Sequence, residues 1–189
     1  TLPEGFATPQ GFATPQAATQ PKRLLNPSGY STNGRLTLMT ESWNTRLRRW
    51  GFNFFPAYRS TGARITYIAA DWREIRIKLP LNWRTRNYVG TIYGGSLYGA
   101  ADPIYMIMLI KLLGPDYIVW DKAASIRFRK PGKSTLTARF VVDPSETDAI
   151  RAALVDQPAI DRVYQIDLVD SQGVVHASVE KTIYIRRKQ

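Results

Sequence analysis

The segment from Gly94 to Leu113 is apolar on nearly every side of a helix, and this restricts the fold more than any other feature of the sequence. Such a helix must be buried on more than one side. Yet it opens with two glycines, Gly94 and Gly95, and carries one carboxylate, Asp102, directly before Pro103. Because glycine weakens a helix and a carboxylate resists burial, each of these residues needs a specific reason.

The residues alone allow two interpretations of this segment. In the first, Asp102 is the N-cap and Pro103 the first residue of a helix that runs to about Leu113, and the glycine-rich part is a loop. In the second, the helix begins at the glycine pair and Pro103 kinks it. Its first N–H groups then point at a ligand, which the glycines allow to approach closely.

The rest of the chain predicts an α+β fold in which a sheet wraps this helix. An N-terminal helix is expected between Leu36 and Phe55, because Leu36, Met39, Trp43, Leu47 and Trp50 recur at helical spacing. We expect that stripe to pack on the domain's own sheet, and a helix lying on a membrane is the alternative. Alternating patterns predict six strands, and a Ser-x-x-Asp start predicts a short helix. The strands fall within residues 63–70, 73–80, 117–131, 134–142, 162–169 and 174–187, and the short helix within 145–158.

Residues 1–33 differ from the rest of the sequence. The hexamer GFATPQ occurs there twice, and prolines with few large apolar residues follow. Such a segment does not bury enough apolar surface to offset the entropy of ordering it. We therefore predict a flexible tail over 1–33 and a single domain over 34–189.

The composition excludes some kinds of chemistry. The chain has no cysteine, so disulfides, Fe–S clusters and thiolate zinc sites are excluded. This composition, with no signal-like segment at the start, leads us to expect a cytoplasmic protein. Lysine and arginine number 26 against 15 acidic residues, a net charge of +11 that attracts phosphates, acidic proteins or anionic membranes. No recognition helix or stacking platform is visible, so neither nucleic acid nor a membrane is the expected partner.

The pattern N-x-x-G-T-x-x-G-G-x-x-x-x-x-A-D, from Asn87 to Asp102, resembles the signature of hotdog-fold acyl-CoA thioesterases of the phenylacetyl-CoA type. The common form has histidine before the glycine pair, where this chain has Tyr93. The chain is more closely similar to the thioesterase-like hotdog group that lacks this histidine and has no settled activity. The resemblance covers Ala63 to Arg187 and implies a curved antiparallel sheet around a long central helix.

The resemblance also implies roles for individual residues. The Gly95 amide would polarise the thioester carbonyl, and Asp102 would act as general base or nucleophile across a dimer interface. Asn87 would orient the water or fix the loop. The implied substrate is an acyl-CoA or acyl-carrier thioester. It would be bound by a homodimer or by a tetramer built from two such dimers. No separate cofactor is implied, since coenzyme A is part of the substrate. The alternative is a non-catalytic protein that binds acyl-CoA.

Further residues are candidates for binding the substrate. Tyr93 either donates a hydrogen bond or fills the acyl pocket, and Gly94 and Tyr98 lie near the helix start. Asp121 is either a polar residue near the thioester or a turn or edge residue. A basic turn carries four candidates for phosphate binding, which are Arg127, Arg129, Lys130 and Lys133. The single histidine, His176, is expected to be an ordinary strand residue, and no metal site is predicted.

Overall fold

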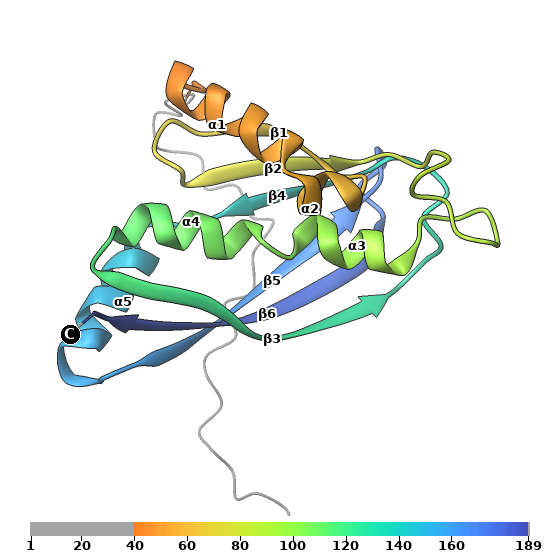
Figure 1. The fold of residues 1–189 in the computed structure, drawn as a ribbon. Helices are drawn as coiled ribbons and strands as arrows, with labels where there is room; N and C mark the ends of the chain where they lie inside the picture. Colours follow the sequence, from red (N-terminus) through yellow and green to blue (C-terminus); the bar gives the residue numbers. More distant parts are fainter. Residues whose placement is uncertain (1–39, 189) are drawn as a thin grey trace, which may run out of the picture. The chain divides into compact units, whose positions relative to one another are not determined.

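The computed structural model of the protein describes residues 40–188. The predicted tail over 1–33 lies outside the described residues. The described part holds an N-terminal helix pair, a split central helix, one further helix and a single sheet (Figure 1). The helices are α1 Trp43–Phe54, α2 Pro56–Ser60, α3 Gly94–Ala101, α4 Ile104–Leu113 and α5 Pro144–Asp156. The strands are β1 Arg64–Ile68, β2 Glu74–Leu79, β3 Tyr117–Phe128, β4 Leu136–Val141, β5 Ile160–Val169 and β6 Val175–Arg187.

The six strands form one antiparallel sheet in the order β1-β2-β4-β5-β6-β3, and the sheet curves around α3 and α4 (Figure 1). The predicted fold class, an antiparallel sheet of about six strands wrapped around a central helix, is therefore confirmed. The longest pairing joins β3 to β6, with a bulge between Asp121 and Ala123. Because β3 is the last strand of the sheet, its outer edge has no strand partner among residues 40–188.

The central helix is two helices separated by a short break. The α3 helix begins at the glycine pair, Asp102 is its C-cap, and α4 begins at Ile104. The interpretation in which the glycine-rich segment is a loop is therefore wrong, and the kinked helix is the one observed. Pro103 causes the break because it has no N–H to donate to the carbonyl of Gly99.

The core lies between these helices and the inner face of the sheet. In α4, Ile104, Met108 and Leu109 are fully buried and pack in one cluster with residues such as Phe140 and Ile183 of the sheet. The segment Gly94–Leu113 is long and apolar enough to cross a bilayer, but half of it is buried inside this domain. Ile110 of α4 is 41% exposed, so the prediction that this segment is buried on more than one side does not hold along its whole length.

The N-terminal helix is oriented differently from the prediction. It begins at Trp43, where Ser42 and Thr45 form a capping box. Its buried residue is Thr45, whereas Trp43, Leu47 and Trp50 of the predicted inward stripe are exposed. The expectation that this stripe packs on the sheet is therefore wrong, because polar contacts turn the helix the other way. Asn53 exchanges two hydrogen bonds with the backbone of Ile65 on β1, at 2.9 and 2.8 Å.

Candidate active site

The glycine pair occupies the first turn of α3. Tyr93 is the N-cap, and the first intrahelical bond runs from the Leu97 amide to the Tyr93 carbonyl at 3.1 Å. The amides of Gly94, Gly95 and Ser96 therefore precede any intrahelical acceptor. Gly95 itself is exposed. The start of α3 thus presents N–H groups, at the positive end of the helix dipole, to whatever binds there.

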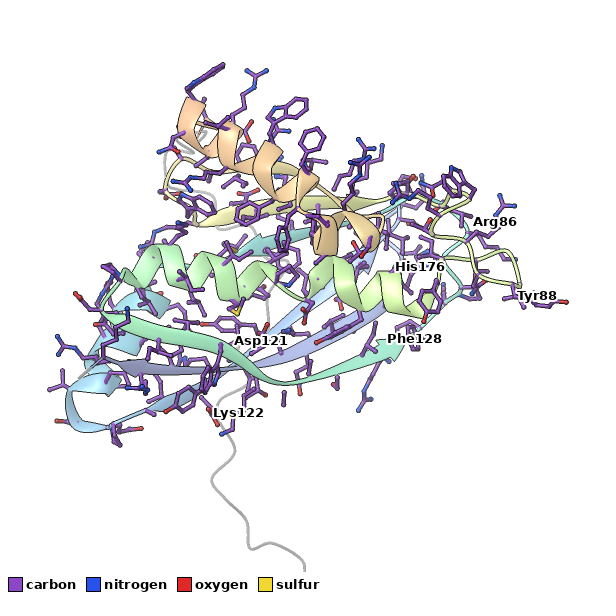
Figure 2. The ribbon with its side chains drawn as sticks, viewed as in Figure 1. Arg86, Tyr88, Asp121, Lys122, Phe128 and His176 are labelled. Carbon is purple, nitrogen blue, oxygen red and sulfur yellow. The ribbon has the colours of Figure 1, made fainter. Side chains whose placement is uncertain are left out.

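Two aromatic rings explain why both residues are glycine. A Cβ on Gly95 would lie 2.4 Å from Cε1 of Tyr93, and a Cβ on Gly94 would lie 3.0 Å from Cζ of Phe128. Phe128 comes from the end of β3, near the start of α3 (Figure 2). Tyr93, which stands where the common family form has histidine, places its ring against Gly95, and its side chain is exposed. The glycines therefore allow close packing of two rings around a helix start that still reaches solvent.

Asn87 fixes the loop before α3. Its Oδ1 accepts hydrogen bonds from the amides of Val89 and Thr91, at 3.1 and 2.9 Å, and its Nδ2 donates to the Thr91 hydroxyl at 2.9 Å. The resemblance implies that Asn87 either orients the water or fixes the loop. Because both polar atoms of its side chain are bonded inside the loop, its contacts are those of the second role.

A cavity of about 350 Å³ lies at this end of α3, and we call it the amide cavity. It brings together Asn87, Gly94, Arg129 and Lys130 of the predicted site residues, with Phe128 beside them. The other two basic candidates, Arg127 and Lys133, are exposed and do not line it. The structure therefore divides the basic turn into two residues that face the helix start and two that do not.

His176 supports this basic turn from β6 (Figure 2). Its carbonyl accepts from the amides of Arg129 and Lys130 at 2.8 and 3.1 Å, and its Nδ1 lies 3.0 Å from the Pro131 carbonyl oxygen. Its Nε2 lies 3.0 Å from Oδ2 of Asp170, and this hydrogen bond holds the pKa of Asp170 below its ordinary value. His176 is thus a buried strand residue, as predicted, with a structural function.

The other end of α3 contains a cluster that the sequence did not predict. Lys181 of β6 is only 1% exposed, and its Nζ lies 2.6 Å from Oδ1 of Asp102 and 3.0 Å from Oδ2 of Asp121. The same Nζ lies 3.5 Å from the hydroxyl of Tyr98 and 5.4 Å from the centre of its ring. The structure therefore joins Asp102, Asp121 and Tyr98, all predicted site residues, through a buried lysine. We call these four residues the lysine cluster.

Asp121 is part of β3 and not of a turn. Its side chain points toward the helices, whereas the side chain of its neighbour Lys122 points away from them (Figure 2). The two residues lie at the β-bulge between Asp121 and Ala123. Its Oδ1 is buried and has no hydrogen-bond partner among the described residues. Asp121 is therefore an edge-strand residue and not a turn residue, and its carboxylate belongs to the lysine cluster.

Burial and mutual attraction set the charges in the lysine cluster. Burial raises the pKa of Asp121 by more than the hydrogen bond from Lys181 lowers it. Burial alone would lower the pKa of Lys181, but its hydrogen bonds to Asp102 and Asp121 raise it above the ordinary value. Burial and then the nearby Asp102 raise the pKa of Tyr98. Because two carboxylates share one ammonium group, the cluster attracts an additional proton or cation.

A second and larger cavity, of about 750 Å³, lies between the helix pair α1–α2 and the helices α3 and α4. We call it the apolar cavity, because its wall is made largely of residues such as Phe52, Met106 and Ile107. Gly99 and Asp102 of α3 also line it. Asp102, with 41% of its side chain exposed, thus touches both the lysine cluster and an apolar space.

No group of three or more histidine or acidic side chains within residues 40–188 has an arrangement that would hold a metal ion. The groups that the candidate site does contain are the amides at the start of α3, the carboxylate of Asp102 beside the apolar cavity, and the basic turn. Such groups suit acyl transfer or the binding of an acyl compound.

Together, the wrapped central helix and the glycine-pair start define a hotdog-fold domain. The chain belongs to the family described as a domain of unknown function, DUF4442, whose model matches residues 45–185. No curated protein matches it.

Solved structures support the same fold. A protein of unknown function from Pseudomonas aeruginosa, named a probable thioesterase, has a TM-score of 0.67 at 20% identity, covering 76% of this chain and 96% of its own. A thioesterase from Haemophilus influenzae has a TM-score of 0.56 at 17% identity, with coverages of 78% and 92%. A hypothetical thioesterase from Streptococcus pneumoniae, crystallised with coenzyme A, has a TM-score of 0.52 at 18% identity, with coverages of 76% and 98%. At these identities the likeness establishes the fold.

Proposed function

We propose that this protein hydrolyses an acyl thioester of coenzyme A or of a carrier protein, at a site shared by two copies of the chain. The observation that carries the proposal is the pairing of free amides at Gly94 and Gly95 with a carboxylate, Asp102, that lines an apolar cavity. No separate cofactor is needed. We place the activity in the cytoplasm, which the cysteine-free sequence fits.

The amide end of α3 suits the oxyanion of a thioester reaction. Attack on the thioester carbonyl produces a tetrahedral intermediate whose oxygen carries negative charge. Amides fixed at a helix start donate to that oxygen without reorganising, and losing one such donor typically costs about 3–4 kcal/mol of transition-state stabilisation. Gly95 is the residue whose amide we assign this role.

The carboxylate end suits activation of water or direct attack. Asp102 is held by Lys181 at 2.6 Å, and it reaches the apolar cavity where an acyl group would lie. The hydrogen bond from the ammonium group fixes the direction of the carboxylate. Asp102 therefore acts as general base or nucleophile in this proposal, and Lys181 positions it.

The spacing along α3 supports the sharing of the site by two copies. Asp102 follows Gly95 by seven residues, which is about 10 Å along a helix axis. A single carbonyl group is too small to contact both residues of one chain at about 3 Å each. The open edge of β3 offers a second copy a strand to pair with. A homodimer, or a tetramer built from two such dimers, would bring Gly95 of one chain to Asp102 of the other.

The amide cavity suits the phosphate-bearing part of the substrate. Arg129 and Lys130 line it beside the helix start, so charge and dipole both favour an anion there. The coenzyme A bound to the Streptococcus pneumoniae protein, which shares the fold, is in keeping with this assignment.

The test is release of free thiol from a panel of acyl-CoAs of increasing chain length. We expect Asp102→Asn to lower the rate by about 100-fold or more, since a positioned acid or base contributes roughly that factor. Asp161→Asn is a matched control, because its side chain is 40% exposed and lies 2.6 Å from Nζ of Lys122, as Asp102 does from Lys181. If wild type hydrolyses no acyl-CoA or acyl-carrier thioester faster than Asp102→Asn, the proposal is wrong.

Mixing of two inactive variants tests the sharing of the site. Gly95→Pro removes the amide donor and Asp102→Asn removes the carboxylate. In a mixed dimer one of the two shared sites keeps both groups, so random pairing should restore about one quarter of wild-type activity. If the mixture is as inactive as the separate variants although mixed dimers form, both groups act within one chain.

A second candidate function is the non-catalytic binding of an acyl compound. It is favoured by the ring of Tyr93 against Gly95 and by the ion pair in which Lys181 already engages the carboxylate of Asp102. Titration calorimetry with acyl-CoAs discriminates the two. Tight binding without turnover supports the binding function, and binding with turnover supports hydrolysis.

A further inference from the structure

The N-terminal helix presents an apolar stripe to solvent. Trp43, Leu47, Trp50 and Phe54 repeat at intervals of four and three residues, so they lie along one face of α1. Their exposed fractions are 79%, 65%, 53% and 59%. A continuous exposed stripe of this size marks an interaction surface and is not an ordinary scatter of surface residues.

The fold does not need this stripe, since α1 is attached to the domain by its opposite face. Thr45 is buried there, and Asn53 bonds the backbone of Ile65. Glu41, just before the helix, forms an ion pair with Arg49 at 2.7 Å and accepts from the Ile68 amide at 3.3 Å. These contacts, with Phe52 packed against the core, hold the helix against β1 and leave Trp43, Trp50 and Phe54 pointing outward.

The surroundings of the stripe are positively charged. Residues 42–63 contain no acidic residue and include four arginines, of which only Arg49 is in an ion pair among the described residues. The guanidinium groups of Arg46 and Arg59 lie 5.9 Å from the ring centres of Trp43 and Phe54. Apolar side chains flanked by arginines, on a helix attached along its length, suit a surface that is apolar inside and anionic outside.

We propose that α1 docks, lying in the plane of the interface, on the surface of an anionic lipid bilayer. Trp43, Leu47, Trp50 and Phe54 enter the boundary between headgroups and acyl chains, and Arg46 and Arg59, which lie beside Trp43 and Phe54, contact the anionic headgroups. The net charge of +11 attracts the protein to such a surface over a longer range. The sequence expectation of no membrane partner relied on the lack of a visible recognition helix or stacking platform. The exposed stripe on α1, which was expected to face inward, is a surface that this expectation did not include.

The apolar cavity lies beside this surface. Leu47, a member of the stripe, and Phe55, which is also exposed, line the cavity, and Asp102 lines it as well. A protein seated through α1 would therefore have the cavity next to the lipid. Membrane docking does not depend on the proposed hydrolysis and is measured separately from it.

The test is co-sedimentation of the full chain with vesicles. We expect little binding to phosphatidylcholine and clear binding when phosphatidylglycerol is added, with affinity that falls as salt is raised. The variant Trp43→Ser/Leu47→Ser should bind the mixed vesicles at least about tenfold more weakly, because two apolar anchors are lost. Val155→Ser, an exposed aliphatic residue of α5 with 74% exposure, is the control and should bind as wild type does.

Charge is tested by a second pair of variants. Arg46→Glu/Arg59→Glu should abolish most of the binding. Arg187→Glu/Lys188→Glu makes the same change of net charge at the exposed end of the described chain and should weaken it much less. Circular dichroism establishes that each variant is folded.

Three results overturn the proposal. One is absence of binding to phosphatidylglycerol vesicles even at low salt. Another is equal binding by the stripe variant and wild type. The third is a change in oligomeric state of the stripe variant together with no lipid binding by wild type, which would make the stripe a contact between copies.

Discussion

The two ends of α3 differ in whether their charges are balanced within the protein. At the amide end, the positive groups of the helix start and of Arg129 and Lys130 face a cavity that is open to an anion. At the carboxylate end, the charges of Asp102 and Asp121 are offset inside the protein by Lys181. The amide end can therefore bind an anionic ligand, whereas the charges at the carboxylate end are mostly neutralised by ion pairs within the protein.

This difference indicates where binding and where stability reside. Removing a group from the amide end should mainly affect ligands, because the surrounding side chains are exposed. Removing Lys181 from the carboxylate end should mainly affect folding, because its ammonium group is buried. The following substitutions test this division, beginning with the largest expected effect.

Lys181→Met should lower the free energy of unfolding by about 3–5 kcal/mol, since it leaves carboxylates near each other without a cation. Urea denaturation measures the loss. Lys122→Met is the control, because its exposed pair with Asp161 should contribute less than about 1 kcal/mol. Equal losses in the two variants would show that the lysine cluster is not a centre of stability.

Arg129→Ala/Lys130→Ala should weaken the binding of coenzyme A by about tenfold, as expected for the loss of charged hydrogen-bond donors, with little change in unfolding. Calorimetric titration measures the affinity. Arg127→Ala/Lys133→Ala removes the same charge from outside the amide cavity and should have a smaller effect. If the two variants lose affinity equally, the attraction is a general effect of charge and not of this cavity.

Asp121→Asn should change how stability depends on pH. Because the pKa of Asp121 is raised in the folded protein, its protonated form is favoured on folding, and that contribution is lost as pH rises from the ordinary value of 3.8 toward the folded pKa. The stability advantage of wild type over the variant should therefore shrink over this window. Thermal unfolding at a series of pH values measures it, and a difference that grows with pH contradicts the assignment.

Asp170→Asn should have the smallest effect, on the basic turn that His176 supports at the amide end. The lowered pKa of Asp170 means that its contribution is present above the unfolded pKa and is lost as pH falls through the folded pKa. The variant should thus be slightly less stable than wild type at neutral pH and equal to it in strong acid. A difference that persists in strong acid would indicate that the hydrogen bond matters and the charge does not.

The strands and the start of α3 could be predicted because local patterns and tertiary structure agree there. Five of the six predicted strand segments contain an observed strand, and the segment 162–169 falls inside β5, which begins two residues earlier at Ile160, since alternation of apolar residues matches burial on one face of a sheet. The family pattern from Asn87 to Asp102 placed the helix start at the glycines, where composition alone favoured Asp102 as a cap.

The orientation of α1 could not be predicted from spacing. Trp43, Leu47 and Trp50 share one face, and periodicity says only that they lie together. Whether that face points inward is decided by Asn53 and Thr45, whose contacts with the rest of the domain depend on the tertiary structure.

Lys181 was missed although the sequence contained a signal. It alternates with Val179, Ile183 and Ile185, all fully buried on one face of β6, so the same alternation places the lysine inward. A charged residue at an inward position requires a partner. The identity of that partner, at the break between α3 and α4, depends on how the helix crosses the sheet and could not be read from spacing.

The proline that ends α3 also affects the wall of the apolar cavity. Since Pro103 has no hydrogen to give, the backbone oxygen of Gly99 lacks its usual helical donor, and Gly99 belongs to that wall. A saturated hydrocarbon chain packed against Gly99 would leave this oxygen without a hydrogen bond, which would cost about 1–3 kcal/mol of binding free energy. A guest bearing a hydroxyl or amide group, or one accompanied by a retained water molecule, would avoid that penalty.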